Sequence, residues 1–378
     1  MSPKPKLLLL ITEDWYFWSH RLPIAIAAQK KGYEVVVATR FQEHWDLIEP
    51  YGFKLLPIKL RRKSRNPLQE LLAVFDLIKI YRREKPDVVH HVTIKPILYG
   101  SWAAILIGVP AIVNAVAGLG YVFIAQGKKA AVFRWLISRA YASAMFSKRS
   151  KVIFQNEEDR QTFVQNGIVA AAQTTIIRGS GVDLEHFPMM PEPVGLPTVM
   201  YAGRLLWDKG LGELIEAIQI LQAQNISFRA VFVGDPDPDN PQSIPEATVR
   251  AWQDQGLIEW WGRREDMPHV LAQATIVVLP SYREGLPKVL LEAGAIGRAV
   301  IANDVVGCRE VVRHGDNGLL VSMGDAQALA QAICELVQSS AKRCEMGKRG
   351  REIVETLFSV EGVVSQTLAI YDEMLTTI

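Results

Sequence analysis

Short apolar runs alternate with longer helical patterns along all 378 residues, and this alternation constrains the fold more than any other feature of the chain. In the first half, apolar runs predict buried strands, and helical patterns lie between them: strands at 7–11, 33–39, 88–91, 111–116 and 152–155, helices at 23–31 and 68–83. The second half repeats the alternation: strands at 198–201, 228–233, 276–280, 299–302 and 319–321, helices at 210–224 and 286–296. Such alternation in both halves predicts two doubly wound α/β domains.

A proline-rich segment separates the two halves. Prolines stand at positions 188, 191, 193 and 197, and such a cluster is typical of a linker between domains. We therefore expect a first domain over residues 1–187 and a second domain over 188–359. Ligands of doubly wound domains bind at the carboxyl ends of the strands, so two facing domains predict a site in the cleft between them.

Charge is divided unequally between the halves, although the whole chain has a formal net charge of only +2. Residues 1–190 carry 26 Lys and Arg against 15 Asp and Glu, a net of +11, whereas residues 191–378 carry 16 against 25, a net of −9. The basic residues cluster over 61–65 and 128–151, and large apolar side chains are interleaved in the second cluster. A basic helix with apolar side chains suits an anionic membrane surface, so we expect acidic lipid and no nucleic acid as partner. The alternative is a helix that packs on the core and has a solvated basic edge.

No segment predicts a signal peptide or a membrane span. The apolar run at 7–11 is too short for a signal sequence, because Glu13 and Asp14 follow it closely. Residues 96–127 contain no charge, but glycines and Pro110 divide them into a helix, a turn, a strand over 111–116 and a glycine loop. Three cysteines in so long a chain exclude a disulfide scaffold and favour a reducing compartment.

Two groups of residues in the second half have the chemistry of a nucleotide-diphosphate site. The first follows the strand at 198–201, where Gly203-Arg204 and Lys209-Gly210 lie on a loop that leads into a helix. An arginine and a lysine beside a helix N-terminus can neutralise a diphosphate, although loops also carry such residues for solubility.

The second group follows the strand at 276–280. Glu284 lies on the loop after this strand, and Glu292 lies about two turns into the next helix among apolar neighbours. A buried carboxylate is costly unless it accepts hydrogen bonds, which ribose hydroxyls could donate. Backbone N–H groups around 285–288 would point from the helix start toward an anion. The alternative is a pair of capping or surface glutamates.

These residues resemble the motifs of the retaining glycosyltransferases of family 4, which have the GT-B fold of two facing, doubly wound Rossmann-like domains with a cleft between them. Residues 284–292 match the E-x7-E motif of that family, and Gly203-Arg204 with Lys209-Gly210 match its diphosphate-binding pair. Residues 178–187, 307–310 and 316–318 resemble its flanking motifs. The resemblance also implies a C-terminal helix, 360–378, that crosses back to the first domain.

The same resemblance implies roles for individual residues. Arg204 and Lys209 would hold the donor diphosphate without a metal ion, and Glu284 would contact the donor sugar. Glu292 would contact the ribose. Five further residues would bind the donor: Gly203, Arg263, Gly285, Leu286 and Pro287.

The first half resembles a narrower group of that family, the enzymes that extend undecaprenyl-diphosphate-linked sugars, among them the α-1,3-N-acetylgalactosaminyltransferase of bacterial N-glycan assembly. Residues 12–21, 90–96 and 117–123 carry this resemblance. The chain departs from the family at two points, because residues 12–20 contain no glycine and Ala117 stands where many members have histidine. The usual acceptor-side histidine is therefore not assigned, and the acceptor-side candidates on cleft-side loops are His20, His91, Lys95 and Gly118.

Together these features predict a retaining hexosyltransferase that moves a hexose or N-acetylhexosamine from a UDP-sugar to an undecaprenyl-diphosphate-linked saccharide. The resemblance implies a cytoplasmic protein, peripheral on the inner face of the plasma membrane, that needs no metal or other cofactor. Two alternatives remain: a glycosyltransferase with a soluble acceptor, and a non-hydrolysing UDP-sugar 2-epimerase of the same two-domain architecture. The sequence leaves open the donor sugar, the linkage and the oligomeric state.

Overall fold

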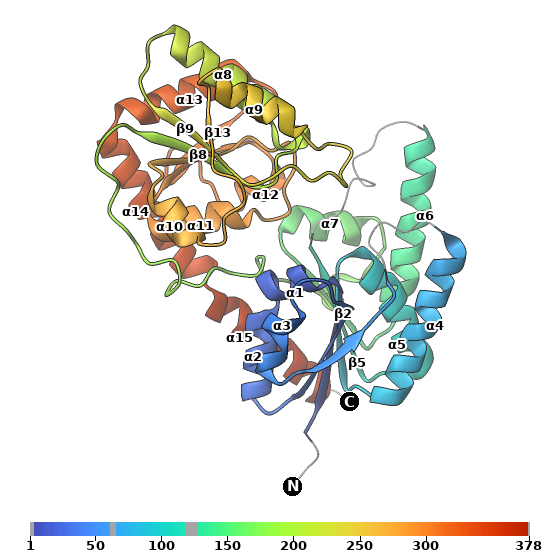
Figure 1. The fold of residues 1–378 in the computed structure, drawn as a ribbon. Coiled ribbons are helices and arrows are strands. Elements are labelled where there is room, and N and C mark those ends of the chain that lie inside the picture. The colour runs from blue at the N-terminus through green and yellow to red at the C-terminus, as the bar shows by residue number, and fades with distance from the viewer. Residues whose placement is uncertain (1–3, 61–65, 118–127, 377–378) are drawn as a thin grey trace. The chain divides into compact units, whose positions relative to one another are not determined.

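The computed structural model describes residues 4–60, 66–117 and 128–376. The chain forms two compact units, shown in Figure 1: an N-terminal unit of Met1–Ser180 with Glu361–Ile378, and a C-terminal unit of Gly181–Val360. Each unit is a parallel sheet with helices on both faces, so the prediction of two doubly wound α/β domains is confirmed.

The N-terminal unit is built on a seven-stranded parallel sheet of order β3-β2-β1-β4-β5-β6-β7. The strands are β1 (Lys6–Glu13), β2 (Glu34–Arg40), β3 (Lys54–Pro57), β4 (Val88–Val92), β5 (Ala111–Val116), β6 (Ser150–Phe154) and β7 (Thr174–Ile176). All residues of β4 and β5 are buried, as expected for central strands that helices cover on both faces.

Helices cover both faces of this sheet. One face carries α1 (Asp14–His20), α2 (Leu22–Lys30) and α15 (Val360–Thr376), whose side chains share one apolar core. The opposite face carries α4 (Pro67–Glu84), α5 (Ser101–Ile107), α6 (Lys128–Met145) and α7 (Glu157–Gln165). The unit also contains the short helix α3 (Trp45–Ile48), the π-helical segment η2 (Pro96–Gly100) and the 3-10 helices η1 (Glu49–Tyr51) and η4 (Ala171–Gln173).

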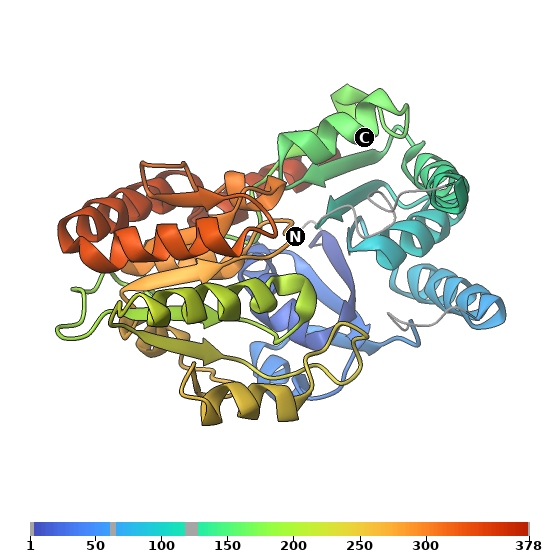
Figure 2. The ribbon, with the colours of Figure 1, turned by 90° about the horizontal axis from the view of Figure 1, so that it is seen from above.

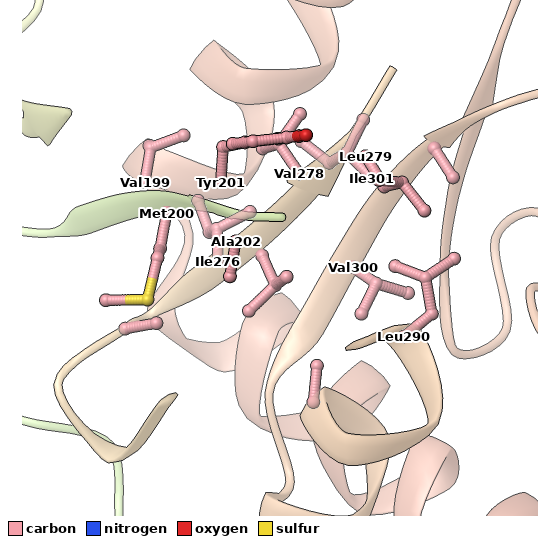
Figure 3. Close-up of a cluster of buried hydrophobic side chains, with 14 of the residues drawn as sticks. Val199, Met200, Tyr201, Ala202, Ile276, Val278, Leu279, Leu290, Val300 and Ile301 are labelled. Carbon is pink, nitrogen blue, oxygen red and sulfur yellow. The ribbon is translucent and has the colours of Figure 1, made fainter. Parts of the chain in front are cut away.

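The C-terminal unit is built on a six-stranded parallel sheet of order β10-β9-β8-β11-β12-β13. The strands are β8 (Thr198–Ala202), β9 (Arg229–Val233), β10 (Glu259–Trp260), β11 (Ile276–Leu279), β12 (Ala299–Asn303) and β13 (Gly318–Val321). The helices are α8 (Leu211–Ala223), α9 (Glu246–Asp254), α10 (Met267–Ala272), α11 (Lys288–Ile296), α12 (Val306–Arg309), α13 (Ala326–Gln338) and α14 (Ser340–Leu357). Helix α8 packs with α13, and α11 packs with α14. Figure 3 shows part of the core, where side chains of β8, β11, β12 and α11 meet.

The border between the units lies at Ser180/Gly181 rather than after Phe187. The N–H of Val182 donates to the carbonyl of Phe358 at 2.9 Å, and Phe187 is buried in the core of the C-terminal unit. The segment before the prolines therefore already belongs to the C-terminal unit. At the other border, α15 belongs to the N-terminal unit, where Tyr371 is fully buried and its hydroxyl lies 2.5 Å from Nδ1 of His90.

The structure corrects two local predictions. His20, expected on a loop, ends helix α1, in which Phe17 and Asp14 are buried. The helix expected from residue 286 begins at Lys288, with Pro287 as its N-cap. Within the described residues, no helix is both long and apolar enough to cross a bilayer.

Replacing Tyr371 with Ala should lower the free energy of unfolding of the N-terminal unit by about 3–5 kcal/mol, because the lost ring leaves a cavity between α15 and the sheet. Tyr371→Phe keeps the ring and removes only the hydroxyl that His90 contacts, so it should cost about 1 kcal/mol. Scanning calorimetry of both variants, with the unfolding of each unit followed separately, checks this. Equal losses in the two variants, or a shift confined to the C-terminal unit, would contradict the prediction.

Candidate active site

The strand order of the C-terminal unit reverses between β8 and β11. From this point β8 is followed outward by β9, and β11 is followed by β12 on the other side. The loops after β8 and β11 therefore diverge and leave room for a ligand at the carboxyl ends of the strands. Most of the predicted donor-site residues lie on these two loops: Gly203, Arg204, Lys209, Glu284, Gly285, Leu286 and Pro287.

Lys209 and Glu284 form an ion pair across the two loops. Nζ of Lys209 lies 2.6 Å from Oε1 of Glu284, and the two side chains are only 20% and 14% exposed. Gly210 makes this approach possible, because a Cβ there would lie 2.0 Å from the carbonyl oxygen of Pro280. Its φ of +71° also favours glycine. The structure thus brings together the two residues that the sequence predicted from separate motifs.

Arg204 is paired with a residue that the sequence analysis missed. Its Nη1 lies 2.9 Å from Oδ2 of Asp237, which stands on the loop after β9. The hydroxyl of Tyr201 donates to the carbonyl of Arg204 at 2.7 Å and fixes the backbone of this loop. The signal that could have found Asp237 is the run Gly234-Asp-Pro-Asp237 directly after a buried strand.

The loop that carries Glu284 is held from the side of β12. The side-chain amide of Asn303 donates to the carbonyl of Pro280 at 2.6 Å. A Cβ on Gly307 would lie 2.5 Å from the carbonyl oxygen of Glu284, so only glycine lets α12 approach this loop so closely. The N-cap of α11 is Pro287, which has no side-chain acceptor, so an anion at this helix start would meet backbone N–H groups of the first turn.

Glu292 lies little more than one turn into α11, and its residue is only 7% exposed. Burial raises the pKa of its carboxyl, whereas Lys288 and His186 act in the opposite direction. Nζ of Lys288 lies 3.3 Å from Oε1 of Glu292. A desolvated carboxylate of this kind is suited to accept hydrogen bonds from ligand hydroxyls.

Arg263 lies on the loop after β10, and its side chain is exposed. Its backbone N–H donates to Oδ1 of Asp235 at 3.1 Å, which joins the loops after β9 and β10. Arg263 therefore stands at the same edge of the sheet as Arg204 and Lys209, but its guanidinium contacts Glu265 rather than either of them.

The acceptor-side candidates of the N-terminal unit lie in different environments. His20 ends α1, half-buried, with its ring stacked on Tyr16 at 4.2 Å and its Nδ1 2.6 Å from Oγ of Ser19. Lys95 is ion-paired with Glu70 at 2.8 Å. Gly118 lies outside the described residues.

His91 lies inside the core rather than on a loop. It is fully buried in β4, and its ring nitrogens lie 2.9 Å from Oη of Tyr81 and 2.9 Å from Oδ1 of Asn114. Burial lowers the pKa of His91 to about 4. The His91 side chain is therefore a neutral member of a buried polar network. Its predicted position at the end of a strand did not indicate this burial.

Arg21 is a further polar residue of the N-terminal unit that the sequence analysis missed. It is 5% exposed, and its Nε has no hydrogen-bond partner within the described part of the chain. It lines a small cavity together with Gln155, Gly179 and Thr367. Its charge helps to keep the pKa of His90 well below the ordinary value, although burial is the larger cause.

The described residues contain no cluster of three or more His, Cys, Asp or Glu side chains that could hold a metal ion. The charged groups at the carboxyl edge of the C-terminal sheet include two cations that each lie beside one carboxylate: Lys209 with Glu284 and Arg204 with Asp237.

Family models match both units. Residues 6–156 match a model described as glycosyl transferase 4-like, and residues 196–339 match a model described as glycosyl transferases group 1.

Three curated relatives match most of the chain. The N,N'-diacetylbacillosaminyl-diphospho-undecaprenol α-1,3-N-acetylgalactosaminyltransferase of Campylobacter jejuni is 28% identical over 94% of this chain and 95% of its own length. The UDP-Gal:α-D-GlcNAc-diphosphoundecaprenol α-1,3-galactosyltransferase of Escherichia coli is 25% identical over 82% and 81%. The α-maltose-1-phosphate synthase of Mycolicibacterium smegmatis is 30% identical over 78% and 81%.

Solved structures share the fold over nearly the whole chain. The sucrose-phosphate synthase of Thermosynechococcus elongatus superposes with a TM-score of 0.80 at 21% identity, over 99% of this chain and 100% of that one. HepE of Anabaena, solved in complex with UDP, superposes with a TM-score of 0.77 at 20% identity, over 99% and 100%.

Replacing Glu292 with Gln should stabilise the ligand-free C-terminal unit at neutral pH. Because burial raises the pKa of Glu292 in the folded state, the folded protein holds this proton more tightly than the unfolded chain does. The associated stability is fully present below the ordinary pKa of glutamate, about 4.3, and is lost as the pH rises through the raised value. Wild type and variant should therefore be equally stable near pH 4, and the variant should become more stable toward pH 7, by about 1.4 kcal/mol for each pH unit between the two pKa values.

Denaturant titrations from about pH 4 to about pH 8 check this prediction. Glu345→Gln is the matched control, because Glu345 is exposed on α14, and its stability curve should run parallel to that of the wild type. A Glu292→Gln protein that is less stable than the wild type at neutral pH would contradict it.

Proposed function

Because the chain belongs to the family 4 glycosyltransferases, we propose that it transfers a sugar, with retention of anomeric configuration, from a UDP-sugar to an undecaprenyl-diphosphate-linked saccharide in surface glycan assembly. One observation carries the proposal: Lys209 and Glu284, from two separate family motifs, meet at 2.6 Å where the strand order reverses. A diphosphate placed there would lie between the loop after β8 and the start of α11.

The donor is proposed to bind through charge and backbone groups of the C-terminal unit. Arg204 and Lys209 would neutralise the diphosphate, and the start of α11 at Lys288 would add backbone N–H groups. HepE, which shares the fold, has been solved with UDP and with UDP-glucose, and the Escherichia coli relative is named for UDP-Gal. Glu292 would accept hydrogen bonds from the ribose. These would replace the hydrogen bonds to water that this carboxylate loses on burial.

The chemistry proposed for the transfer needs no general base from the protein. The bond between the anomeric carbon and the diphosphate breaks, and the departing diphosphate gains negative charge that Arg204 and Lys209 stabilise. The acceptor hydroxyl forms the new bond on the same face of the sugar, and its proton passes to a diphosphate oxygen. Glu284 would contact the donor sugar while its ion pair with Lys209 is kept. The α-1,3 linkage in the names of two relatives is the product that retention gives from an α-linked nucleotide sugar.

The acceptor is proposed from the relatives and from the charge of the N-terminal half. The Campylobacter jejuni and Escherichia coli relatives are both named for undecaprenol-linked diphosphate acceptors. Residues 1–190 carry 26 Lys and Arg against 15 Asp and Glu, which suits an anionic bilayer that holds such a lipid. We place the protein in the cytoplasm, bound peripherally to the inner face of the plasma membrane.

A soluble acceptor is the second candidate, because the α-maltose-1-phosphate synthase is 30% identical over 78% of this chain. The test is a screen of radiolabelled UDP-sugars against lipid-linked saccharides and, in parallel, against free sugar phosphates and oligosaccharides. Label that moves only to soluble acceptors would overturn the lipid-linked acceptor. An epimerase would instead convert the donor sugar with no acceptor present, so product analysis without acceptor separates it from a transferase.

Lys209→Ala should lower kcat by about 100- to 1000-fold, because the charge that develops on the leaving diphosphate loses a partly buried cation. Turnover with saturating donor and acceptor measures this effect. Lys342→Ala is the matched control, because Lys342 lies on α14 and pairs with Glu335, away from the loops after β8 and β11. A folded Lys209→Ala enzyme with undiminished turnover would remove this residue from the mechanism.

Asp237→Asn should lower the KM for the donor by up to about fivefold with kcat unchanged. Asp237 holds Arg204 in an ion pair that is 50% and 29% exposed, and an exposed pair of this kind is worth about 0–1 kcal/mol. Removing the carboxylate frees the guanidinium for the diphosphate. Asp254→Asn makes the same charge change at the end of α9 and should leave the KM unaltered. A raised KM in Asp237→Asn would show instead that Asp237 positions Arg204 for the donor.

A further inference from the structure

Helix α4 has an apolar stripe that faces away from the sheet. Leu68, Leu71, Leu72 and Phe75 are 66%, 53%, 56% and 52% exposed, and their spacing of three and four residues places them on one side of the helix. The side that faces the sheet is formed by other residues, such as the buried Leu77. The stripe is therefore separate from the side of α4 that packs against the core.

Helix α6 has a second stripe of the same kind. Val132, Trp135 and Leu136 are 61%, 61% and 52% exposed and again share one side of the helix by their spacing. Buried side chains of α6, among them Tyr141 and Met145, stand in its C-terminal half.

The two stripes lie on the same layer and toward the same edge of the N-terminal unit. Helices α4, α5 and α6 cover one face of the sheet, and α5 packs against both of the others, as Figures 1 and 2 show. Each of α4 and α6 follows a parallel strand, so its N-terminal half lies at the carboxyl edge of the sheet. We call the seven side chains the α4/α6 surface: Leu68, Leu71, Leu72, Phe75, Val132, Trp135 and Leu136.

The charges around the α4/α6 surface have one sign over a long stretch. Between Asp87 and Glu157 the sequence contains no Asp or Glu, but it contains eight Lys and Arg. One turn beyond each stripe stands an exposed cation, Lys79 after Phe75 and Arg139 after Trp135. On α4 itself, Glu70 is neutralised by an ion pair with Lys95, and Asp76 is half-buried.

Grouped apolar side chains beside an excess of positive charge indicate what covers the surface. Exposed large apolar residues are ordinary when scattered, but a group of seven on two helices that both pack against α5 marks an interaction surface. A second copy of the chain would bring two strongly basic surfaces together, which costs free energy. A bilayer with anionic lipid accommodates both features, since acyl chains accept the apolar side chains while phosphates attract the cations.

We propose that the α4/α6 surface is a membrane-docking surface, which inserts its apolar side chains into the headgroup boundary of an anionic bilayer while Lys79 and Arg139 remain at the level of the phosphates. The inference deepens the proposed function and rests on it for the identity of the partner. Its deciding measurement, the binding of vesicles, needs neither sugar donor nor acceptor, so the two can fail separately.

Sedimentation of the full chain with vesicles of phosphatidylcholine and phosphatidylglycerol tests the apolar part. The double variant Phe75→Glu/Trp135→Glu should bind these vesicles about tenfold more weakly for each side chain removed. Leu68→Glu and Leu106→Glu form a matched pair, because both leucines are 66% exposed on helices of the same layer, but Leu106 lies near the end of α5, just before β5 begins. Leu68→Glu should weaken binding and Leu106→Glu should not.

The cations give an independent arm of the same experiment. Lys79→Gln and Arg139→Gln should each weaken binding to the anionic vesicles by about fivefold and reduce its dependence on salt. Binding to vesicles of phosphatidylcholine alone should change little. The fluorescence difference between wild type and Trp135→Phe should shift to shorter wavelength when anionic vesicles are added, because the indole then leaves water.

Several outcomes would overturn the proposal. They are equal sedimentation of wild type and Phe75→Glu/Trp135→Glu, an equal loss in Leu106→Glu, and a wild-type dimer that Trp135→Glu dissociates without any binding to vesicles. Circular dichroism and UDP binding by each variant confirm that it is folded. If Phe75→Glu/Trp135→Glu transfers sugar to a short-chain soluble acceptor at the wild-type rate while failing to bind vesicles, docking and catalysis are separate, as proposed.

Discussion

The proposed donor site depends on the close backbone approach of loops that follow neighbouring strands in the C-terminal sheet. The loop after β8 touches the loop after β11 at Gly210, where a Cβ would lie 2.0 Å from the carbonyl oxygen of Pro280. It touches the loop after β9 at Gly234, where a Cβ would lie 2.0 Å from the carbonyl oxygen of Gly203. The reversal of strand order between β8 and β11 opens the space, and these glycines allow its walls to come within reach of one ligand.

Charge in this site is balanced before any ligand arrives, at a cost in stability. The Lys209–Glu284 pair is largely shielded from water, so each group needs the other to offset its lost hydration. Glu292 pairs with Lys288 at 3.3 Å, and its raised pKa shows that burial outweighs that attraction. A binding site can retain such a carboxylate, because a ligand hydroxyl satisfies it at the moment of binding.

The sequence predicted the fold wherever an element buries a continuous apolar run, as β1, β5, β8 and β11 do. It failed for the short strands β3, β7 and β10, whose residues are largely exposed or half-buried and carry no such run. It failed for α1 as well, because Trp15, Tyr16, Phe17 and Trp18 are weak helix formers that tertiary contacts hold in place. The pairing of Arg204 with Asp237 and the burial of Arg21 and His91 arise from tertiary approach, which spacing along the chain does not encode.

The position of the α4/α6 surface follows from the same topology that positions the proposed donor site. In a doubly wound domain, every helix begins at the edge of the sheet where the strands end and where ligands bind. An apolar stripe confined to the N-terminal half of α4, followed by Lys79 and then by Arg82 and Arg83, therefore runs from apolar to basic away from that edge. A bilayer that receives the apolar end would meet the N-terminal unit beside the loops after its strands. A lipid-linked acceptor would then reach those loops from the membrane without leaving it.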